Sequence, residues 1–199
     1  MKVSTTNAPA AEIETEALVL AIPDDTGKPT PWDAVDAIVG GIVSEALAGP
    51  GFQGKRGQTL ALSTPGSRCR ELILVGLGTS AEIDLEAWRR AVANGASKAR
   101  QRGNSRIAVP LPEIDGHDFE ELATAATEAA ILTSYRYREF KAASTEEVGL
   151  EEILIAAPVD IASATTRAQK IADAACWARD LVNTPSNMKR PDSLAARAM

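Results

Sequence analysis

Two glycine-containing stretches of the sequence carry residue types that could bind an anion. Residues 49–57 read Gly-Pro-Gly-Phe-Gln-Gly-Lys-Arg-Gly, and backbone N–H groups together with a lysine can cradle a phosphate. Residues 76–80 follow an apolar run, where glycines can also open a ligand loop. Because neither stretch contains a Walker or dinucleotide-binding pattern, a flexible connection at the first and a tight strand-to-helix turn at the second are the favoured interpretations.

Residues suited to acid–base or metal chemistry are sparse. His117 is the only histidine, with Asp115 and Asp118 beside it, and a catalytic base or metal ligand needs more partners than these. We therefore interpret His117 as a loop or helix-start residue, and Asp24 and Asp25 as a solvated turn. With one histidine there is no Ser-His-Asp set, and no Asp, Glu and Lys cluster follows the apolar runs. The sequence predicts no catalytic, cofactor-binding or metal-binding residue.

Composition limits the class of protein. The 199 residues are 45% hydrophobic, which is enough for one sizeable core. A net charge of −6 argues against a nucleic-acid or anionic-membrane surface. Cys69 and Cys176 have neither metal nor redox spacing and are predicted to be buried thiols. Residues 1–12 are polar and no apolar run is long enough to span a membrane, so we expect a soluble cytoplasmic protein with a disordered amino-terminal tail.

Five apolar runs are typical of β-strands and alternate with helical patterns. The predicted strands are Glu16–Ile22, Gln58–Ser63, Glu71–Leu77, Ser105–Pro110 and Glu151–Ala157. The second and third flank a turn at Thr64–Ser67, which predicts a hairpin or two neighbouring strands. Alternation of strands and helices predicts the α/β class, as a three-layer αβα sandwich around a mixed, mainly parallel sheet.

The helical patterns have identifiable starts. A turn at Gly27–Pro31 precedes a helix that we expect to be capped by Thr30 and to continue to Ala46, weakened in its middle by Gly40 and Gly41. Three further helices are predicted, at Asp84–Arg102, Phe119–Thr133 and Ile161–Val182. Tyr135 and Tyr137 follow the end of the second of these, and Asp160 is expected to cap the start of the third. The predicted core face of the last helix comprises Ala164, Ala168, Ile171, Ala175, Ala178 and Leu181. The two tyrosines are expected to pack against the sheet or a partner domain.

The segment Arg179–Pro185, followed by Asn187, Pro191, Leu194 and Ala195, resembles the junction between the two domains of leucyl aminopeptidases. Two weaker matches lie upstream, at Val75–Gly78 and at the aromatic and basic stretch Tyr135–Lys141. The resemblance implies a macro-domain-like amino-terminal domain at residues 13–160. It also implies a linker helix at 161–182 and the start of a catalytic domain at 183–199, most of which lies beyond this sequence.

The family comprises cytoplasmic exopeptidases with two divalent metal ions, manganese or zinc, in the catalytic domain. Those domains form a homo-hexamer, with the amino-terminal domains at its periphery, where they help to pack subunits and shape access. The resemblance thus implies a parent enzyme that releases amino-terminal residues, with leucine preferred, from peptides in intracellular protein turnover. The 199-residue chain is expected to be inactive alone and to contact its own catalytic domain through Tyr135–Lys141 and the polar face of Ile161–Val182.

The sequence also leaves two other functions open. A free-standing macro-like module would bind ADP-ribose or a nucleotide, using a phosphate loop at residues 76–80, and a thermal shift with ADP-ribose would reveal it. A plain assembly domain would bind no small ligand and would associate with a separately produced catalytic domain.

Overall fold

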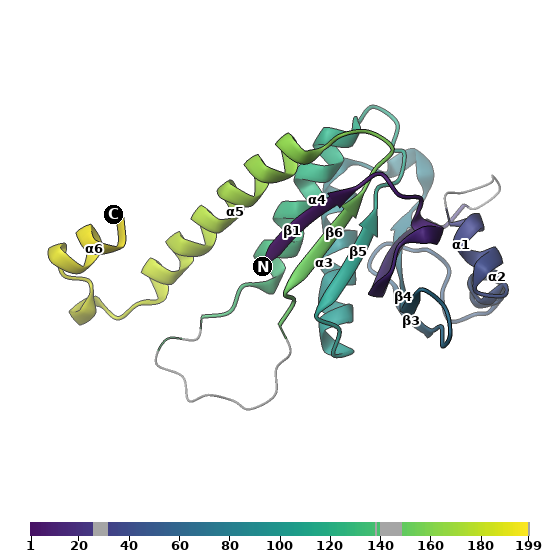
Figure 1. The fold of residues 1–199 in the computed structure, drawn as a ribbon, viewed down its shortest axis with the longest axis horizontal. Helices are drawn as coiled ribbons and strands as arrows, with labels where there is room; N and C mark the ends of the chain where they lie inside the picture. Colours follow the sequence, from purple (N-terminus) through teal and green to yellow (C-terminus); the bar gives the residue numbers. More distant parts are fainter. Residues whose placement is uncertain (26–31, 138, 140–148, 199) are drawn as a thin grey trace.

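A mixed sheet of six strands forms the centre of the computed structural model, which describes residues 1–25, 32–137, 139 and 149–198. The strand order is β1-β6-β5-β2-β4-β3 (Figure 1), and only β3 runs antiparallel, to its neighbour β4. The strands are β1 (Lys2–Thr6), β2 (Thr15–Pro23), β3 (Thr59–Ser63), β4 (Cys69–Gly78), β5 (Arg106–Pro110) and β6 (Glu152–Ala156). All five predicted strands are present, and β3 and β4 are paired neighbours as expected.

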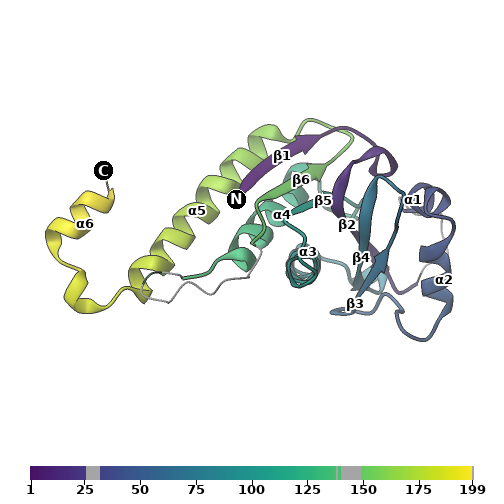
Figure 2. The same cartoon turned by 60° about the horizontal axis from the view of Figure 1, so that its bottom comes forward.

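Helices cover both faces of this sheet (Figure 2). One face carries α1 (Asp33–Ile38) and α2 (Ile42–Ala48), and the other α3 (Leu85–Gln101), α4 (Phe119–Ser134) and α5 (Ala162–Asn183). Alternate residues of β2 point to opposite layers, with Val19 in the α3–α4 core and Leu18 and Leu20 in the α1–α2 core. The predicted three-layer αβα sandwich is confirmed. The other helical elements of the described residues are three 3₁₀ turns and a last helix: η1 (Ala10–Glu12), η2 (Ser80–Glu82), η3 (Ser186–Met188) and α6 (Pro191–Ala198).

The amino terminus differs from its prediction. Lys2–Thr6 forms β1 and pairs in parallel with β6, so a disordered tail is wrong for these residues. The side chain of Glu152 in β6 also binds the edge strand β1, because its Oε1 accepts hydrogen bonds at 2.7 Å from both Lys2 Nζ and Ser4 Oγ. These contacts join residues about 150 positions apart, which a local polar pattern cannot indicate.

The predicted helix through Gly40 and Gly41 is broken into α1 and α2. Both glycines have left-handed φ angles, 76° and 83°, which end one helix and start the next. The buried Asp36 carboxylate then accepts hydrogen bonds from the N–H groups of Val43 at 2.7 Å and Ser44 at 3.3 Å, so it caps α2. The expected cap Thr30 and the turn at residues 27–31 lie outside the described residues.

Glu16 joins β2 to the start of β5. Its Oε2 accepts hydrogen bonds from the N–H groups of Ser105 at 2.6 Å and Arg106 at 3.1 Å. Burial acts to raise the pKa of Glu16, but these N–H groups and the Arg106 charge outweigh it, and the pKa lies below its ordinary value. Ionised Glu16 therefore stabilises the fold above the ordinary glutamate pKa of about 4.3, and this contribution is lost as the pH falls through the lower folded-state pKa.

Replacing Glu16 with glutamine is expected to destabilise the chain at neutral pH and to matter progressively less in acid. The difference in unfolding free energy between wild type and E16Q should stay constant above about pH 5 and shrink as the pH falls further, measured by urea denaturation. The lowered pKa of Glu71 is common to both proteins and cancels in this difference. A difference that stays constant with pH would contradict the assignment.

Candidate functional site

The second half of α5 extends beyond the body of the domain (Figure 1). Its buried residues are Ala164, Thr165, Ala168 and Ala172, and no later residue of the helix is buried. The predicted core face is thus wrong for Ile171 and Ala178, which are exposed. Ile171 lies beside the buried Ala172 but off the buried side of the helix. The second half of α5 meets the end of α4, where Arg179 Nη1 donates to the Leu132 carbonyl oxygen at 3.1 Å, and none of its residues is buried, so the periodic pattern continues there without a core to cover.

The end of α4 holds this extended half in place. The Tyr135 hydroxyl donates to Asp180 Oδ1 at 2.7 Å and accepts from Asn183 Nδ2 at 3.2 Å. Arg179 lies over the Tyr135 ring, 5.5 Å from its centroid. Burial first, and then the hydrogen bond to Asp180, raise the pKa of Tyr135. The Tyr137 hydroxyl reaches Thr184 Oγ1 at 3.4 Å, so both tyrosine hydroxyls contact the carboxyl-terminal end of α5.

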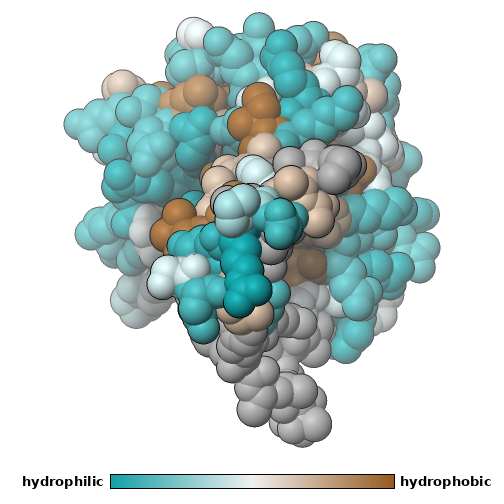
Figure 3. Space-filling view, turned by 90° about the vertical axis from the view of Figure 1, so that its left-hand side faces the viewer, coloured by the Kyte–Doolittle hydropathy of each residue, from teal (hydrophilic) through white to brown (hydrophobic). Residues whose placement is uncertain are grey.

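Large apolar side chains are exposed around this part of the chain. We define the docking surface as Ile171, Trp177, Val182 and Met188, of which Trp177 is 43% and Val182 78% exposed. Ile171 and Val182 are eleven residues apart and share one face of the helix, whereas Trp177 lies on another. Apolar surface interrupts the hydrophilic surface at this end of the molecule (Figure 3). A helix apolar on more than one side is typical of a segment enclosed by further protein.

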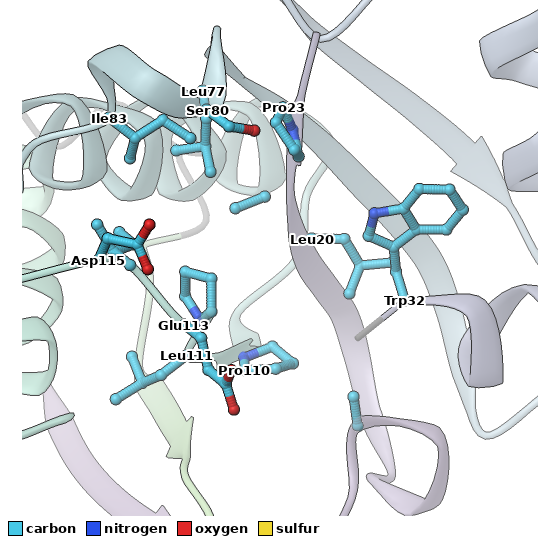
Figure 4. A pocket seen from close by; sticks show the side chains of 14 residues that line it. Leu20, Pro23, Trp32, Leu77, Ser80, Ile83, Pro110, Leu111, Glu113 and Asp115 are labelled. Carbon is cyan, nitrogen blue, oxygen red and sulfur yellow. The ribbon is translucent and has the colours of Figure 1, made fainter. Parts of the chain in front are cut away.

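A cavity of about 330 Å³ lies at the carboxyl ends of β2, β4 and β5 (Figure 4). It arises because β2 and β5 pair only through Ala17 with Ile107 and Leu18 with Ala108, and then separate. Beyond β5 the chain follows β6 instead, since Leu111 N–H donates to the Ala156 carbonyl oxygen at 2.9 Å. This is the point where the strand order reverses, the usual place for ligands in α/β sheets.

The lining of this strand-end cavity is mostly apolar. Leu20, Leu77, Ile83, Leu111 and Ile114 form much of it. Its polar members are Ser80, Glu113, Asp115 and the indole of Trp32, and no lysine, arginine or histidine occurs among the described lining residues. Sequence reasoning missed this cavity, because it depends on the separation of two strands that lie about 90 residues apart.

Residues 49–57 do not form a phosphate-binding loop. The N–H groups of Gln53 and Lys55 donate to Gln58 Oε1 at 2.9 and 3.1 Å, so both are already paired within the loop and are not available to an anion. The Gly54 carbonyl oxygen accepts from Gly78 N–H at 2.8 Å. A Cβ at Gly54 would lie 2.4 Å from the Pro23 carbonyl oxygen, and close packing therefore explains this glycine.

A carboxylate of the chain itself already occupies the loop at residues 76–80. Asp25 Oδ1 accepts from the Ser80 N–H at 3.0 Å and from its hydroxyl at 2.5 Å. Thr79 Oγ1 lies 3.5 Å from Asp24 Oδ2. The aspartates predicted to form a solvated turn thus hold the loop that follows β4, and an added anion would meet their charge.

The remaining candidates are placed outside both sites. His117 Nδ1 lies 3.0 Å from Glu121 Oε2 beside the start of α4, which Asp118 caps through the Glu121 N–H at 2.8 Å. Cys69 is buried as predicted, but Cys176 is only partly buried, and burial raises the pKa of its thiol. No three His, Cys, Asp or Glu side chains of the described residues could hold a metal ion. No described helix is both long and apolar enough to cross a bilayer.

These features define a macrodomain-like α/β module with a cavity at the switch point of its sheet. Among solved structures, a Trypanosoma brucei macrodomain has the same fold, with a TM-score of 0.60 and 14% identity over 83% of this chain and 65% of that one. A tomato leucine aminopeptidase mutant superposes with a TM-score of 0.83 and 24% identity, covering all of this chain and 41% of that one. Both likenesses concern the fold alone.

Sequence comparison identifies the family. Residues 19–144 match the model of the cytosol aminopeptidase family, N-terminal domain. A probable cytosol aminopeptidase of Syntrophotalea carbinolica is 33% identical over 96% of this chain and 40% of that protein. The chain therefore belongs to the cytosol aminopeptidase family, of which it carries the amino-terminal domain. It spans about 32–40% of the length of the curated relatives it matches.

Proposed function

We propose that this chain is the non-catalytic amino-terminal domain of a two-metal leucyl aminopeptidase acting on peptides in the cytoplasm during protein turnover. The relatives are named as probable cytosol aminopeptidases, and the chain matches only their amino-terminal part. The residues described here do not fit a two-metal site, since no cluster of three metal-binding side chains occurs among them. The manganese or zinc ions would be held by the catalytic domain, and this domain serves assembly and access to the active site.

The proposed domain boundaries are those that the family resemblance implies. In this proposal residues 13–160 belong to the body, to whose described part β1 adds an edge strand, and residues 161–182 are the linker helix. Residues 183–199 begin the catalytic domain. Support comes from α5, because its second half and α6 lie beyond the sheet (Figures 1 and 2). The tyrosine contacts at the end of α4 fix the direction in which this linker leaves the body.

The exposure of the docking surface is the single observation that carries the proposal. A group of large exposed apolar side chains marks a protein interface more often than a single exposed apolar residue does. The exposure of Trp177 and Val182 makes the docking surface a better candidate for contact with the catalytic domain than the polar face of the helix. The partner of the docking surface is the chain's own catalytic domain. If the whole protein forms a homo-hexamer, neighbouring subunits would also lie near the end of the domain that carries this surface.

Association with a separately produced catalytic domain tests this role. We expect the Trp177→Ser, Val182→Ser double variant to bind at least about tenfold more weakly, because large apolar residues dominate interface energies. Isothermal titration calorimetry would give both dissociation constants. The melting temperature of the double variant alone should match that of wild type, since both side chains are exposed in the isolated chain.

Ile38 provides the matched control. It is an exposed apolar residue on α1, at the opposite end of the molecule from α6 (Figure 1), and Ile38→Ser should leave binding unchanged. Equal binding by the double variant and wild type would refute the docking surface, as would equal weakening by the control.

A further inference from the structure

We propose that the second half of α5 is a hinged segment, which opens independently of the body of the domain and is held closed by a clamp at the end of α4. The hinged segment is residues 173–183, which follow Ala172, the last buried residue of the helix. The clamp consists of Tyr135, directly after α4, and of Arg179, Asp180 and Asn183 on α5. Opening is a property of the chain itself and requires no partner.

The two halves of α5 are held by different kinds of contact. In the first half Ala164, Ala168 and Ala172 are no more than 2% exposed. The Ala162 N–H at the start of the helix also donates to Asp160 Oδ1 at 2.9 Å. No residue of 173–183 is buried. Burial of apolar surface therefore fixes only the first half against the body.

The hinged segment is too short to be a stable helix by itself. It spans about three turns, and isolated helices of fewer than about 12–15 residues are marginal in water. It continues from the anchored first half and needs no new nucleus, but its last turns would fray without further contacts. Segments with few buried apolar contacts open at free energies well below that of global unfolding. The order of residues 173–183 therefore depends on contacts made near their end.

The clamp supplies such contacts through both side chains and backbone. The Tyr135 hydroxyl donates to the Asp180 carboxylate at 2.7 Å and accepts from Asn183 at 3.2 Å. A hydrogen bond to an ionised acceptor is stronger than one between neutral groups. Arg179 lies over the Tyr135 ring and donates to the Leu132 carbonyl oxygen at 3.1 Å. All of these bonds join the end of α4 to the last two turns of α5, so their loss would free the segment as a unit.

The hinged segment carries part of the docking surface. Trp177 and Val182 belong to it, and α6 follows it in the chain. A closed clamp presents both side chains in one direction, and a surface that is already ordered loses less conformational entropy when it binds. This consequence for docking rests on the proposed function. The opening itself does not, because it is measured on this chain alone.

Backbone amide hydrogen exchange of the 199-residue chain, followed by NMR, tests the hinge. In wild type, amides of residues 177–183 should exchange faster than those of residues 166–172. Tyr135→Phe keeps the ring beside Arg179 but removes both hydroxyl bonds. We expect it to speed exchange in residues 177–183 at least about tenfold and to leave residues 166–172 and β2 unchanged.

Asp180→Ala is a second variant, for which the clamp and the helix alone predict opposite results. Alanine has the higher helix propensity, and removing a carboxylate near the carboxyl end of a helix is favourable for the helix dipole. The substitution would therefore slow exchange if the helix stood by itself. Because it removes the acceptor of the Tyr135 hydroxyl, we expect faster exchange in residues 177–183 instead.

Ser67→Ala is the matched control. It also removes a hydroxyl, one that donates to the Cys69 carbonyl oxygen at 2.6 Å in the turn before β4, and it should leave exchange in α5 unchanged. Equal exchange rates in the two halves of wild-type α5 would overturn the proposal. So would unchanged rates in the Tyr135→Phe and Asp180→Ala variants, or an equal acceleration in β2, which would mean that the whole domain is destabilised.

Discussion

Replacing Gly76 with alanine is expected to lower the unfolding free energy by at least about 3 kcal/mol or to prevent folding. A Cβ at this position would lie 2.0 Å from the Lys55 carbonyl oxygen and 2.6 Å from that of Gly54. Both obstacles are backbone atoms, so no side-chain rotation relieves them. Gly76 N–H also donates to the Gln58 carbonyl oxygen at 2.9 Å, which holds the crossing loop against β4.

Gly51 is the matched control for this substitution. It belongs to the same loop, has no neighbour within 4 Å of an added Cβ, and has no left-handed φ angle. Gly51→Ala should therefore change stability by no more than about 0.5 kcal/mol. Urea denaturation gives the unfolding free energies of the two variants. Equal values would mean that the loop does not pack against β4 as closely as described.

Replacing Trp88 with alanine should cost about 3–5 kcal/mol of unfolding free energy. Trp88 is fully buried in the core formed by α3, α4 and the sheet, and its Nε1 donates to the Leu122 carbonyl oxygen at 2.9 Å. The substitution removes the largest side chain of that core and leaves a cavity between two alanine-rich helices, whose short side chains cannot fill it.

Phenylalanine separates packing from hydrogen bonding at this position. Trp88→Phe retains much of the ring volume but loses the bond to Leu122, and it should cost about 1–3 kcal/mol, clearly less than alanine. Chemical denaturation with tyrosine or circular-dichroism detection suits all three proteins. If the two variants lose the same stability, the hydrogen bond and not the packing would be the dominant contribution of Trp88.

Much of the fold could be predicted because its strands are continuous apolar runs. β2 and β4 are buried on both faces beyond their first residues, and their sequences from Ala17 and from Leu72 onward are correspondingly apolar. β1 was missed because its polar residues lie at the sheet edge, where pairing with β6 replaces burial. The break between α1 and α2 was foreseen only as a weakness, since the left-handed angles of Gly40 and Gly41 are not determined by local composition.

Less of the candidate site could be predicted. The family junction directed attention to α5, but the exposure of Ile171 and Trp177 depends on which side of α5 packs against α4 and β1, which periodicity alone does not show. The contact between Tyr135 and Asp180 joins residues 45 positions apart. The buried, unpaired Nε1 of Trp32 depends on the surrounding fold and has no local sequence signal.

The most direct test of the proposed role is leucine-anilide hydrolysis by the purified 199-residue chain with Mn²⁺. We expect no turnover above the metal-only control for the chain alone, because its described residues offer no metal-ligand cluster. A separately produced catalytic domain serves as the positive control under the same conditions. Hydrolysis that increases in proportion to the concentration of the chain alone would contradict its assignment as a non-catalytic domain.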